Sequence, residues 1–493
     1  MSNDHSTFAV TTLGCKVNQA DSEAIGEQMS TAGFVQRDFN EAADIYIVNT
    51  CTVTHLGDRS SRQMIAQAHR RQPDALLVVT GCYAELNPQG VAALPGVDLV
   101  VGNQHKDSLV TAIEYHLQSH QTAHEDIAPT TQARRERSLP VLPLDTQHIG
   151  SDGTLAFGAA EAEPQPDNPS VAAQFIAPYS PFTESTQSTT QANARIFSRT
   201  RVQMKVQDGC DNRCTYCIVP YVRGKSRSRS IASVVEHVQR KARAGFQEIV
   251  LTGIHLGDYH PIDDEQRDLG DLISALLQET TIPRIRVSSL EPEDFQLTWL
   301  SLWQNPRMCR HFHLPMQSGS DTILRKMARR YNSERYSTIV TTAKRLIPGV
   351  AITTDIITGF PGETEEDFEQ TYQLASALAF AKTHVFRFSP RQGTTAARMR
   401  VQIKDEVKKA RSQRLLDLNE EHSRLFRQQF LGETVQVLIE QYKHGCWEGL
   451  TDNYLRVEIH DLPANHNWQN ALLNVHLTQL VDDGIYGTYA QRG

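Results

Sequence analysis

Three cysteines lie close together near the middle of the chain, at Cys210, Cys214 and Cys217. Their spacing lets three thiolates converge from one loop, and Gly209 in front of the first cysteine permits a tight turn. Iron–sulfur clusters in proteins are held by cysteine thiolates. Three ligands leave one iron of a four-iron cluster open, and an open position is typical of a site that performs chemistry. The spacing therefore predicts a catalytic iron–sulfur cluster.

Two other readings of this loop remain open from spacing alone. Cys214 and Cys217 could form a thioredoxin-like redox pair or half of a zinc site. A zinc site would need further ligands downstream, and the nearest candidates are Cys309, His311 and His313, on an apolar stretch typical of a strand. Because that stretch predicts core or barrel-lining residues, the cluster is the favoured interpretation.

A second set of cysteines follows from the pattern of residues 8–117. Apolar runs alternate there with amphipathic stretches, which predicts an open parallel sheet with crossover helices. The apolar runs are Phe8–Leu13, Ile45–Val48, Leu76–Val79 and Val97–Val101, and the amphipathic stretches lie near Asp21–Ala32 and Asp58–Arg70. Cys15, Cys51 and Cys82 each follow the carboxyl end of a predicted strand, where open parallel sheets bind ligands. A single cysteine there would usually be a buried apolar residue, but three equivalent positions favour a second cluster, again with one open iron.

Residues 119–195 differ in composition from the rest of the chain. They contain eight prolines, neither Cys nor Trp, and many Gln, Thr, Ser and Ala residues. Such a segment buries too little apolar surface to offset its ordering entropy. We therefore predict a disordered insertion or linker between an N-terminal domain at 6–118 and a central domain at 196–429.

The central region predicts a partial (β/α)6 barrel, whose active site belongs at the carboxyl ends of its strands. Its strand candidates are Val202–Gln207, Glu248–Leu251, Arg284–Ser288, His311–Pro315, Ile352–Ile357 and Thr383–Phe388, and its helix candidates are Ile231–Ala244, Leu269–Gln278, Asp321–Arg330 and Glu365–Leu378. A charged helix is expected at 400–428. Short β-type runs at 430–493 predict a small antiparallel barrel.

Length and charge limit the function classes. The 493 residues are enough for about three domains. A formal net charge of −8 does not favour nucleic-acid binding by the chain as a whole. Two basic runs nevertheless suggest a local phosphate-binding surface; they are Arg223, Lys225, Arg227, Arg229, Arg240, Lys241 and Arg243, and Lys404, Lys408, Lys409, Arg411 and Arg414. The N-terminus lacks signal-peptide features, and no apolar run reaches membrane-spanning length. A cytoplasmic protein is therefore expected. In that compartment cysteines more often serve metal binding or catalysis than disulfide bonds.

Several motifs occur in the order found in one known family. They are residues 14–19 (GCKVNQ), 49–53 (NTCTV), 80–82 (TGC), the three-cysteine loop, 219–224 (VPYVRG), 288–292 (SSLEP), 313–320 (HLPMQSGS), 359–364 (GFPGET) and 389–394 (SPRQGT). Apart from 119–195, the chain resembles the radical S-adenosylmethionine (radical SAM) methylthiotransferases, which end in a small β-barrel called TRAM. Within that family, residues 14–19 and 49–54 are most similar to the enzymes that modify N6-threonylcarbamoyladenosine in tRNA.

The resemblance implies a reaction and a set of site residues. It implies that the cluster on Cys210, Cys214 and Cys217 reduces S-adenosylmethionine to form a 5′-deoxyadenosyl radical. The cluster on the N-terminal cysteines would then carry the sulfur that becomes a methylthio group at carbon 2 of the adenine, an unactivated carbon that needs radical chemistry. Cofactor-binding candidates by resemblance are Tyr216, Thr252, Gly253, Ser289, Glu291 and Gln317. The implied partners are a tRNA anticodon loop with adenosine 37, an electron donor such as flavodoxin or ferredoxin, and a sulfur donor.

Three alternatives remain. The substrate could be isopentenyladenosine in tRNA or an aspartate of a ribosomal protein, and a zinc-stabilised RNA-binding module without catalysis is a different class altogether. The TRAM-like region has few basic residues, namely Lys443, Arg456 and Arg492. We therefore expect RNA affinity on the basic barrel segments, in particular at Arg227 and Arg229.

Overall fold

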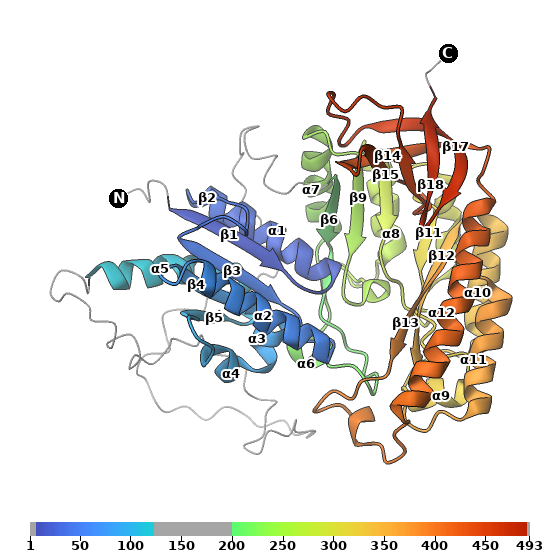
Figure 1. Ribbon diagram of the computed structural model, residues 1–493, viewed down its shortest axis with the longest axis horizontal. Helices are drawn as coiled ribbons and strands as arrows, with labels where there is room; N and C mark the ends of the chain where they lie inside the picture. The colour runs from blue at the N-terminus through green and yellow to red at the C-terminus, as the bar shows by residue number, and fades with distance from the viewer. Residues whose placement is uncertain (1–5, 123–199, 491–493) are drawn as a thin grey trace. The chain divides into compact units, whose positions relative to one another are not determined.

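A computed structural model describes residues 6–122 and 200–490 (Figure 1). The chain forms two compact units: the first contains the described residues up to 122 together with Ile218–Gly224, and the second contains the other described residues. Each unit is described below by itself. The predicted insertion at 119–195 lies outside the described residues except for 119–122, which end a helix. Within the described ranges, no helix is long and apolar enough to cross a membrane.

The first unit is built on a five-stranded parallel sheet, drawn in blue in Figure 1. Its strands lie in the order β2 (Val35–Gln36), β1 (Thr7–Thr12), β3 (Ile45–Thr50), β4 (Leu76–Gly81) and β5 (Leu99–Val101). All of its strand pairs are parallel. The predicted open parallel sheet is therefore confirmed, and only the short β2 strand was not predicted.

Helices cover both faces of this sheet because successive side chains of a strand point to opposite faces. In β3, Ile45 and Ile47 pack with Ile25 of α1, whereas Tyr46 and Val48 pack on the other face. The helices are α1 (Lys16–Thr31), α2 (His55–Arg71), α3 (Cys82–Leu86), α4 (Pro88–Ala92) and α5 (Leu109–Thr122). Strands β3 and β4 are buried along their whole length, which explains why they read as continuous apolar runs.

A short helix from the middle of the chain belongs to the first unit. Helix α6 (Val219–Arg223) begins directly after the three-cysteine loop. Ile218 and Val222 pack in one apolar cluster with Cys82, and Asn103 Nδ2 donates to the Val222 carbonyl at 2.7 Å. The chain thus enters the first unit immediately after Cys217 and then returns to the second.

The second unit contains six parallel barrel strands, as predicted. They are β6 (Arg201–Lys205), β9 (Glu248–Thr252), β10 (Arg284–Val287), β11 (His311–His313), β12 (Ala351–Thr358) and β13 (Lys382–Arg387). The pairing order is β10-β9-β6 in one sheet and β11-β12-β13 in the other. Isolated parallel bridges, Ile285↔Met308 and Ser289↔His313, join the two sheets. Strands β7 (Gln207–Asp208) and β8 (Arg227–Ser228) form a separate short antiparallel pair.

Helices pack on the outside of these strands around the largest apolar core of the described residues. They are α7 (Ile231–Arg243), α8 (Leu269–Glu279), α9 (Asp321–Lys326), α10 (Ser333–Leu346), α11 (Glu365–Leu378) and α12 (Asp405–Gln428). Helix α11 starts at a capping box formed by Thr364 and Asp367. Helix α9 is shorter than predicted because Ala328 adopts a left-handed conformation, with φ of +58°. Helix α10 was not predicted.

The C-terminal region is a closed five-stranded barrel, shown in red in Figure 1. Its strands are β14 (Thr434–Lys443), β15 (Cys446–Thr451), β16 (Arg456–Ile459), β17 (Leu472–Val481) and β18 (Gly484–Tyr489). The predicted antiparallel pairing holds for four of the five strand pairs of this barrel, and only β16 and β18 pair in parallel. The long connection between β16 and β17 carries the chain to the other side of the barrel. Strand β18 then lies beside β16 and runs in the same direction.

The C-terminal barrel packs against the amino ends of the six-stranded barrel. Arg201, the first residue of β6, binds Glu440 at 2.7 Å. Arg286 in β10 donates to the Thr451 carbonyl at 3.1 Å and forms a fully buried ion pair with Glu248, the first residue of β9, at 2.7 Å. The contact therefore covers the amino ends of these strands and leaves their carboxyl ends for a site.

Replacing Arg286 with methionine is expected to destabilise the second unit by about 3–5 kcal/mol, because Glu248 would keep a buried charge without its closest partner. Urea unfolding followed by tryptophan fluorescence measures this, since all four tryptophans lie in the second unit. The matched control is Arg267→Met, which removes an exposed pair with Asp264 and should change stability by about 0–1 kcal/mol. Equal stability of the two variants would contradict the role of Arg286.

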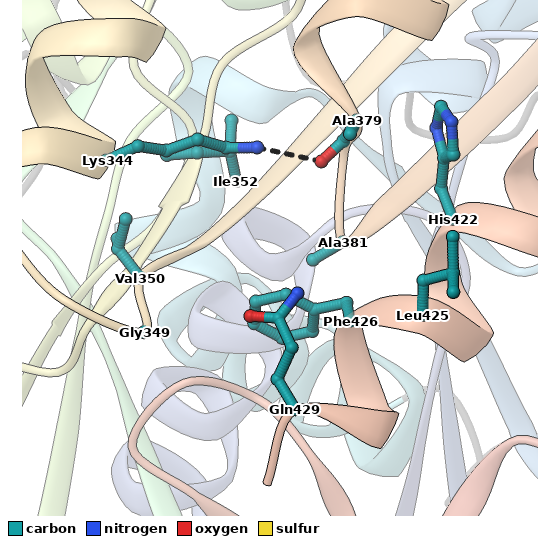
Figure 2. A pocket seen from close by; sticks show the side chains of 10 residues that line it. All are labelled: Lys344, Gly349, Val350, Ile352, Ala379, Ala381, His422, Leu425, Phe426 and Gln429. Carbon is teal, nitrogen blue, oxygen red and sulfur yellow. Dashed lines mark hydrogen bonds between the residues drawn. The ribbon is translucent and has the colours of Figure 1, made fainter.

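A cavity of 220 Å³ lies on the outer side of the six-stranded barrel, between α10 and α12 (Figure 2). Lys344 reaches across it and donates to the Ala379 carbonyl at 2.8 Å. Phe426 and Leu425 of α12 form an apolar side of the cavity. The cavity contains none of the cysteines or the cofactor-binding candidates, so the candidate site lies elsewhere.

Candidate functional site

The first unit places its three cysteines at one edge of the sheet. Cys15 caps the amino end of α1, Cys51 follows β3, and Cys82 is the first residue of α3. Each comes directly or almost directly after the carboxyl end of β1, β3 or β4, which are neighbours in the sheet. The strand order reverses between β1 and β3, and open α/β sheets bind ligands at such a switch point. The position of the three cysteines is thus the one predicted from the sequence.

The three sulfur atoms are close enough to influence one another. Burial raises the pKa of the Cys51 thiol to about 11, and the negative charges of Cys82 and Cys15 act in the same direction. Gly14 makes this approach possible, because a side-chain carbon at that residue would lie 2.7 Å from Cys51 Sγ. A metal centre removes such repulsion by binding thiolates directly. The donor set therefore fits an iron–sulfur cluster.

A buried polar network surrounds this edge of the sheet. Asp21 accepts from Lys106 at 2.8 Å and from Arg223 at 3.2 Å, and all three side chains are buried. One carboxylate thus faces two cationic side chains. Burial lowers the pKa of Lys106, while the charges of Asp21 and Cys82 oppose this shift. Buried cationic side chains at this edge of the sheet suit a thiolate-bound cluster, whose net charge is negative.

Sequence reasoning missed most of this network. Only Arg223 belonged to a motif, and it was predicted to lie on a phosphate-binding surface, whereas it is buried against Asp21. Asn103 donates to Cys82 Sγ at 3.5 Å, although it lies well beyond the three cysteine motifs. A buried Lys or Asp in an amphipathic helix has no distinctive spacing, so the sequence offered no signal for Asp21 or Lys106.

In the second unit, Cys210, Cys214 and Cys217 lie on one loop after β7, and all three are half-buried. Gly209 has φ of +75°, as the predicted tight turn requires. The Cys217 amide donates to the Cys214 carbonyl at 3.0 Å. Thr215 fixes the loop through its amide, which donates to the Met327 carbonyl at 3.1 Å. Backbone hydrogen bonds therefore hold the loop in this conformation.

Two side chains approach the sulfur atoms of this loop. Arg329 donates to Cys214 Sγ at 3.3 Å and also pairs with Glu291 and Glu293. His255 Nδ1 lies 3.7 Å from Cys210 Sγ. Hydrogen bonds to cluster sulfurs are a main determinant of reduction potential. Neither residue was predicted from the sequence, because their strands and loops are distant from the cysteines along the chain.

His255 is itself held by a carboxylate. Its Nε2 lies 2.5 Å from Asp294 Oδ2. Burial alone would lower the pKa of His255, but the hydrogen bonds to Asp294 and Cys210 raise it to about 11. The imidazole is therefore positioned as a hydrogen-bond donor to Cys210.

Replacing His255 with leucine is expected to lower the reduction potential of the cluster on this loop. A hydrogen bond to a charged group contributes roughly 1.5 kcal/mol, which corresponds to on the order of 60 mV for a one-electron couple. A redox titration monitored by electron paramagnetic resonance (EPR) measures the shift. His260→Leu changes an exposed histidine of the same loop and should leave the potential unchanged. An unchanged potential in the His255 variant would show that the contact does not reach the cluster.

The cofactor-binding candidates lie at the carboxyl ends of the barrel strands or on the cysteine loop. Thr252 ends β9 and is followed by Gly253, Ser289 follows β10, and Gln317 follows β11. Two buried hydroxyl oxygens here, Thr252 Oγ1 and Ser288 Oγ, have no hydrogen-bond partner among the described residues. Buried polar atoms normally have partners, so these oxygens fit a polar ligand such as S-adenosylmethionine.

Three of the candidates also have contacts within the protein. Glu291 is paired with Arg329. Tyr216 packs edge-to-face against Phe360, with ring centroids 6.4 Å apart. Gln317 has φ of +59° and bridges to Ile356. A non-glycine residue in this conformation is strained, and such strain is found at functional sites.

The predicted phosphate-binding surface is wrong for several of its residues. Arg229 is only 5% exposed and donates to Ser233 Oγ at 2.7 Å. Burial is also the main cause that lowers its pKa to about 10. On α12, Lys408 and Arg411 are buried, and Arg411 binds Glu363 at 2.7 Å. Arg229 precedes α7 and is held by Ser233 of that helix, whereas α12 directs Lys408 and Arg411 inward, which residue type alone does not reveal.

A partial barrel of parallel strands, with a three-cysteine loop after its first strand, defines a radical SAM protein. Comparison with family models agrees: residues 204–375 match the radical SAM superfamily, and residues 7–102 match the uncharacterized protein family UPF0004.

Comparison with curated proteins identifies the branch. The chain is 36% identical to the threonylcarbamoyladenosine tRNA methylthiotransferase MtaB of Bacillus subtilis, over 92% of this chain and 90% of that protein. It is 34% identical to the protein of the same name from Aquifex aeolicus, over 91% and 96%. A tRNA-2-methylthio-N(6)-dimethylallyladenosine synthase from Methylacidiphilum infernorum is 30% identical over 97% and 94%. The chain belongs to the radical SAM methylthiotransferase family.

A solved structure supports the fold. The radical S-adenosylmethionine methyltransferase TsrM from Kitasatospora setae, with cobalamin and a [4Fe-4S] cluster bound, superposes with a TM-score of 0.52 at 16% identity. The match covers 80% of this chain and 77% of that one. At this identity the likeness concerns the fold alone. As a family member, the protein uses two [4Fe–4S] clusters and S-adenosylmethionine.

Proposed function

We propose that this protein converts N6-threonylcarbamoyladenosine at position 37 of tRNA into its 2-methylthio derivative. The observation that carries the proposal is the identity to the threonylcarbamoyladenosine tRNA methylthiotransferases, which extends over more than nine-tenths of the chain. The two cysteine sets, each with three members, supply the chemical means. The reductant and the sulfur donor are expected to be separate proteins or small molecules, and the reaction is expected in the cytoplasm with the tRNA.

The ligand assignment is part of the proposal. Cys15, Cys51 and Cys82 hold the cluster of the first unit, and their mutual approach and the adjacent cationic network support this. Cys210, Cys214 and Cys217 hold the cluster that binds S-adenosylmethionine. When bound, these groups supply an electron, a radical and a sulfur atom. The protein side chains orient them: Arg329 and His255 donate to sulfur atoms, and Thr252 offers a hydroxyl to the cofactor.

The domain organisation follows the same proposal. Domains at 6–118 and 196–429 carry the two clusters, residues 119–195 form an insertion, and 430–493 form a TRAM domain. The closed barrel from β14 to β18 supports the last assignment. Because Arg229 is buried, RNA binding by the basic run is expected to rest on its exposed members, such as Lys225.

The substrate is tested in a bacterial strain that lacks its own methylthiotransferases. Expression of the protein should restore the 2-methylthio derivative of N6-threonylcarbamoyladenosine, detected by mass spectrometry of tRNA nucleosides. Restoration of the isopentenyladenosine derivative instead would favour that nucleoside as the substrate, because one relative with that activity in its name is 32% identical. A methylthio group on neither nucleoside would contradict the proposal.

A further inference from the structure

Three potential metal ligands meet on the strands of the second sheet of the barrel. His313 ends β11, Asp355 lies in β12, and His384 lies in β13. The strand register pairs His313 with Thr353 and His384 with Asp355. Because alternate residues of a strand share a face, the three side chains emerge on one face. One ligand atom of each lies within 4.8 Å of the others.

This face is the concave one, away from the outer helices. The neighbouring residues of β12, Ile352 and Ile356, point into the apolar core beneath those helices. Asp355 lies on the opposite face of the strand from these two residues. Its side chain therefore points toward the inside of the barrel. The side chains of His313 and Asp355 are 17% and 26% exposed, and His384 is exposed. An ion from solvent can reach all three.

The separation of the ligand atoms is compatible with a shared ion. His313 Nε2 lies 3.4 Å from Asp355 Oδ1. This is longer than the 2.7–3.2 Å that is typical of N–H···O hydrogen bonds. Two ligands of a tetrahedral zinc ion, with bonds of about 2.0–2.1 Å, lie about 3.4 Å apart. The observed distance thus already matches one edge of a zinc coordination shell.

The orientation of His313 is also that of a metal ligand. Its Nδ1 lies 2.9 Å from Thr353 Oγ1, a hydroxyl that is itself within 3.4 Å of the Phe312 carbonyl. Metal-binding histidines almost always donate their second ring N–H to a carboxylate, a backbone carbonyl or water, which fixes the ring and directs the other nitrogen to the metal, and the Thr353 hydroxyl is the corresponding partner for His313. Here that other nitrogen is Nε2, on the side of Asp355.

We propose that His313, Asp355 and His384 form a binding site for a divalent transition-metal ion such as Zn²⁺. Two imidazoles and one carboxylate suit zinc or iron(II). Three protein ligands leave at least one coordination position, which would take water or another oxygen donor inside the barrel. The site is separate from the six cysteines, and it does not depend on which nucleoside is the substrate.

The test uses reconstituted holoenzyme, so that the cysteines are occupied by iron. The protein is incubated with one equivalent of ZnSO₄ and desalted, and zinc and iron are then measured by mass spectrometry. We expect about one retained zinc per chain. The zinc-edge X-ray absorption spectrum should show only nitrogen and oxygen neighbours, at about 2.0–2.1 Å, whereas a zinc bound to cysteine would show sulfur at about 2.3 Å.

Asp355→Asn and His384→Gln should each abolish zinc retention while leaving the iron content unchanged. The matched control is His460→Gln, because Cys446, Glu458 and His460 form the other group of potential ligands among the described residues. That variant should retain zinc. The proposal is overturned if the wild-type protein retains no zinc, if sulfur neighbours appear, or if both site variants retain zinc at the wild-type level.

Discussion

Cys15→Ala is expected to abolish methylthio transfer to tRNA while S-adenosylmethionine is still cleaved to 5′-deoxyadenosine. The reason is that Cys15 belongs to the first unit, whereas the loop with Cys210 and the barrel strands belong to the second. Loss of one ligand should prevent stable assembly of the first cluster only. Chromatography of 5′-deoxyadenosine and mass spectrometry of tRNA nucleosides, from the same reaction, measure the two outcomes.

Cys15 is the most suitable member of its set for this experiment. It is exposed, and its side chain makes no capping hydrogen bond to α1, so alanine should not disturb the helix. Cys446→Ala is the control because Cys446 lies in the C-terminal barrel, outside both sets. It should retain both activities. Product formation by the Cys15 variant at the wild-type rate would show that Cys15 is no ligand of a required cluster.

Cys214→Ala is expected to abolish both 5′-deoxyadenosine formation and methylthio transfer. Cys214 is the central cysteine of its loop and receives a hydrogen bond from Arg329. Without this thiolate the loop offers only two ligands, so no cluster should assemble on it. The cofactor would then have no cluster from which to receive an electron. The expected fall in 5′-deoxyadenosine is to the background of enzyme-free reactions.

The Cys214 variant should nevertheless keep the cluster of the first unit. An EPR spectrum of the reduced variant should therefore still contain one cluster signal, and Cys309→Ala should retain both signals because Cys309 is an isolated core residue. Residual 5′-deoxyadenosine formation by the Cys214 variant, above that background, would contradict the assignment of this loop.

The sequence predicted the elements that carry both sets of cysteines, and the reason is physical. Strands β3 and β4 are buried on both faces and therefore appear as uninterrupted apolar runs. The cysteines follow their carboxyl ends, so the topology of a parallel sheet was enough to bring Cys51 and Cys82 together. For similar reasons, the predicted ends of the barrel strands lie within two residues of the observed ends.

What the sequence did not predict depends on long-range contacts. Helix α6 joins the first unit because Arg223 meets Asp21, a residue far away along the chain. Arg286 appeared as an ordinary basic residue, yet it is buried against Glu248. Arg229 was expected on the surface and is turned inward by Ser233. A charged residue type predicts a solvent-exposed side chain. The exceptions become apparent only from the residue that the charged side chain contacts in the folded structure.

We expect each unit to bind one four-iron cluster through three cysteines. The decisive measurement is Mössbauer spectroscopy of ⁵⁷Fe-reconstituted protein, combined with iron analysis. We expect about eight irons per chain in two [4Fe–4S] clusters for the wild type. Each variant in which all three cysteines of one set are replaced by alanine should contain about four irons. A wild-type protein with a single cluster, or two variants that both retain the full iron content, would contradict it.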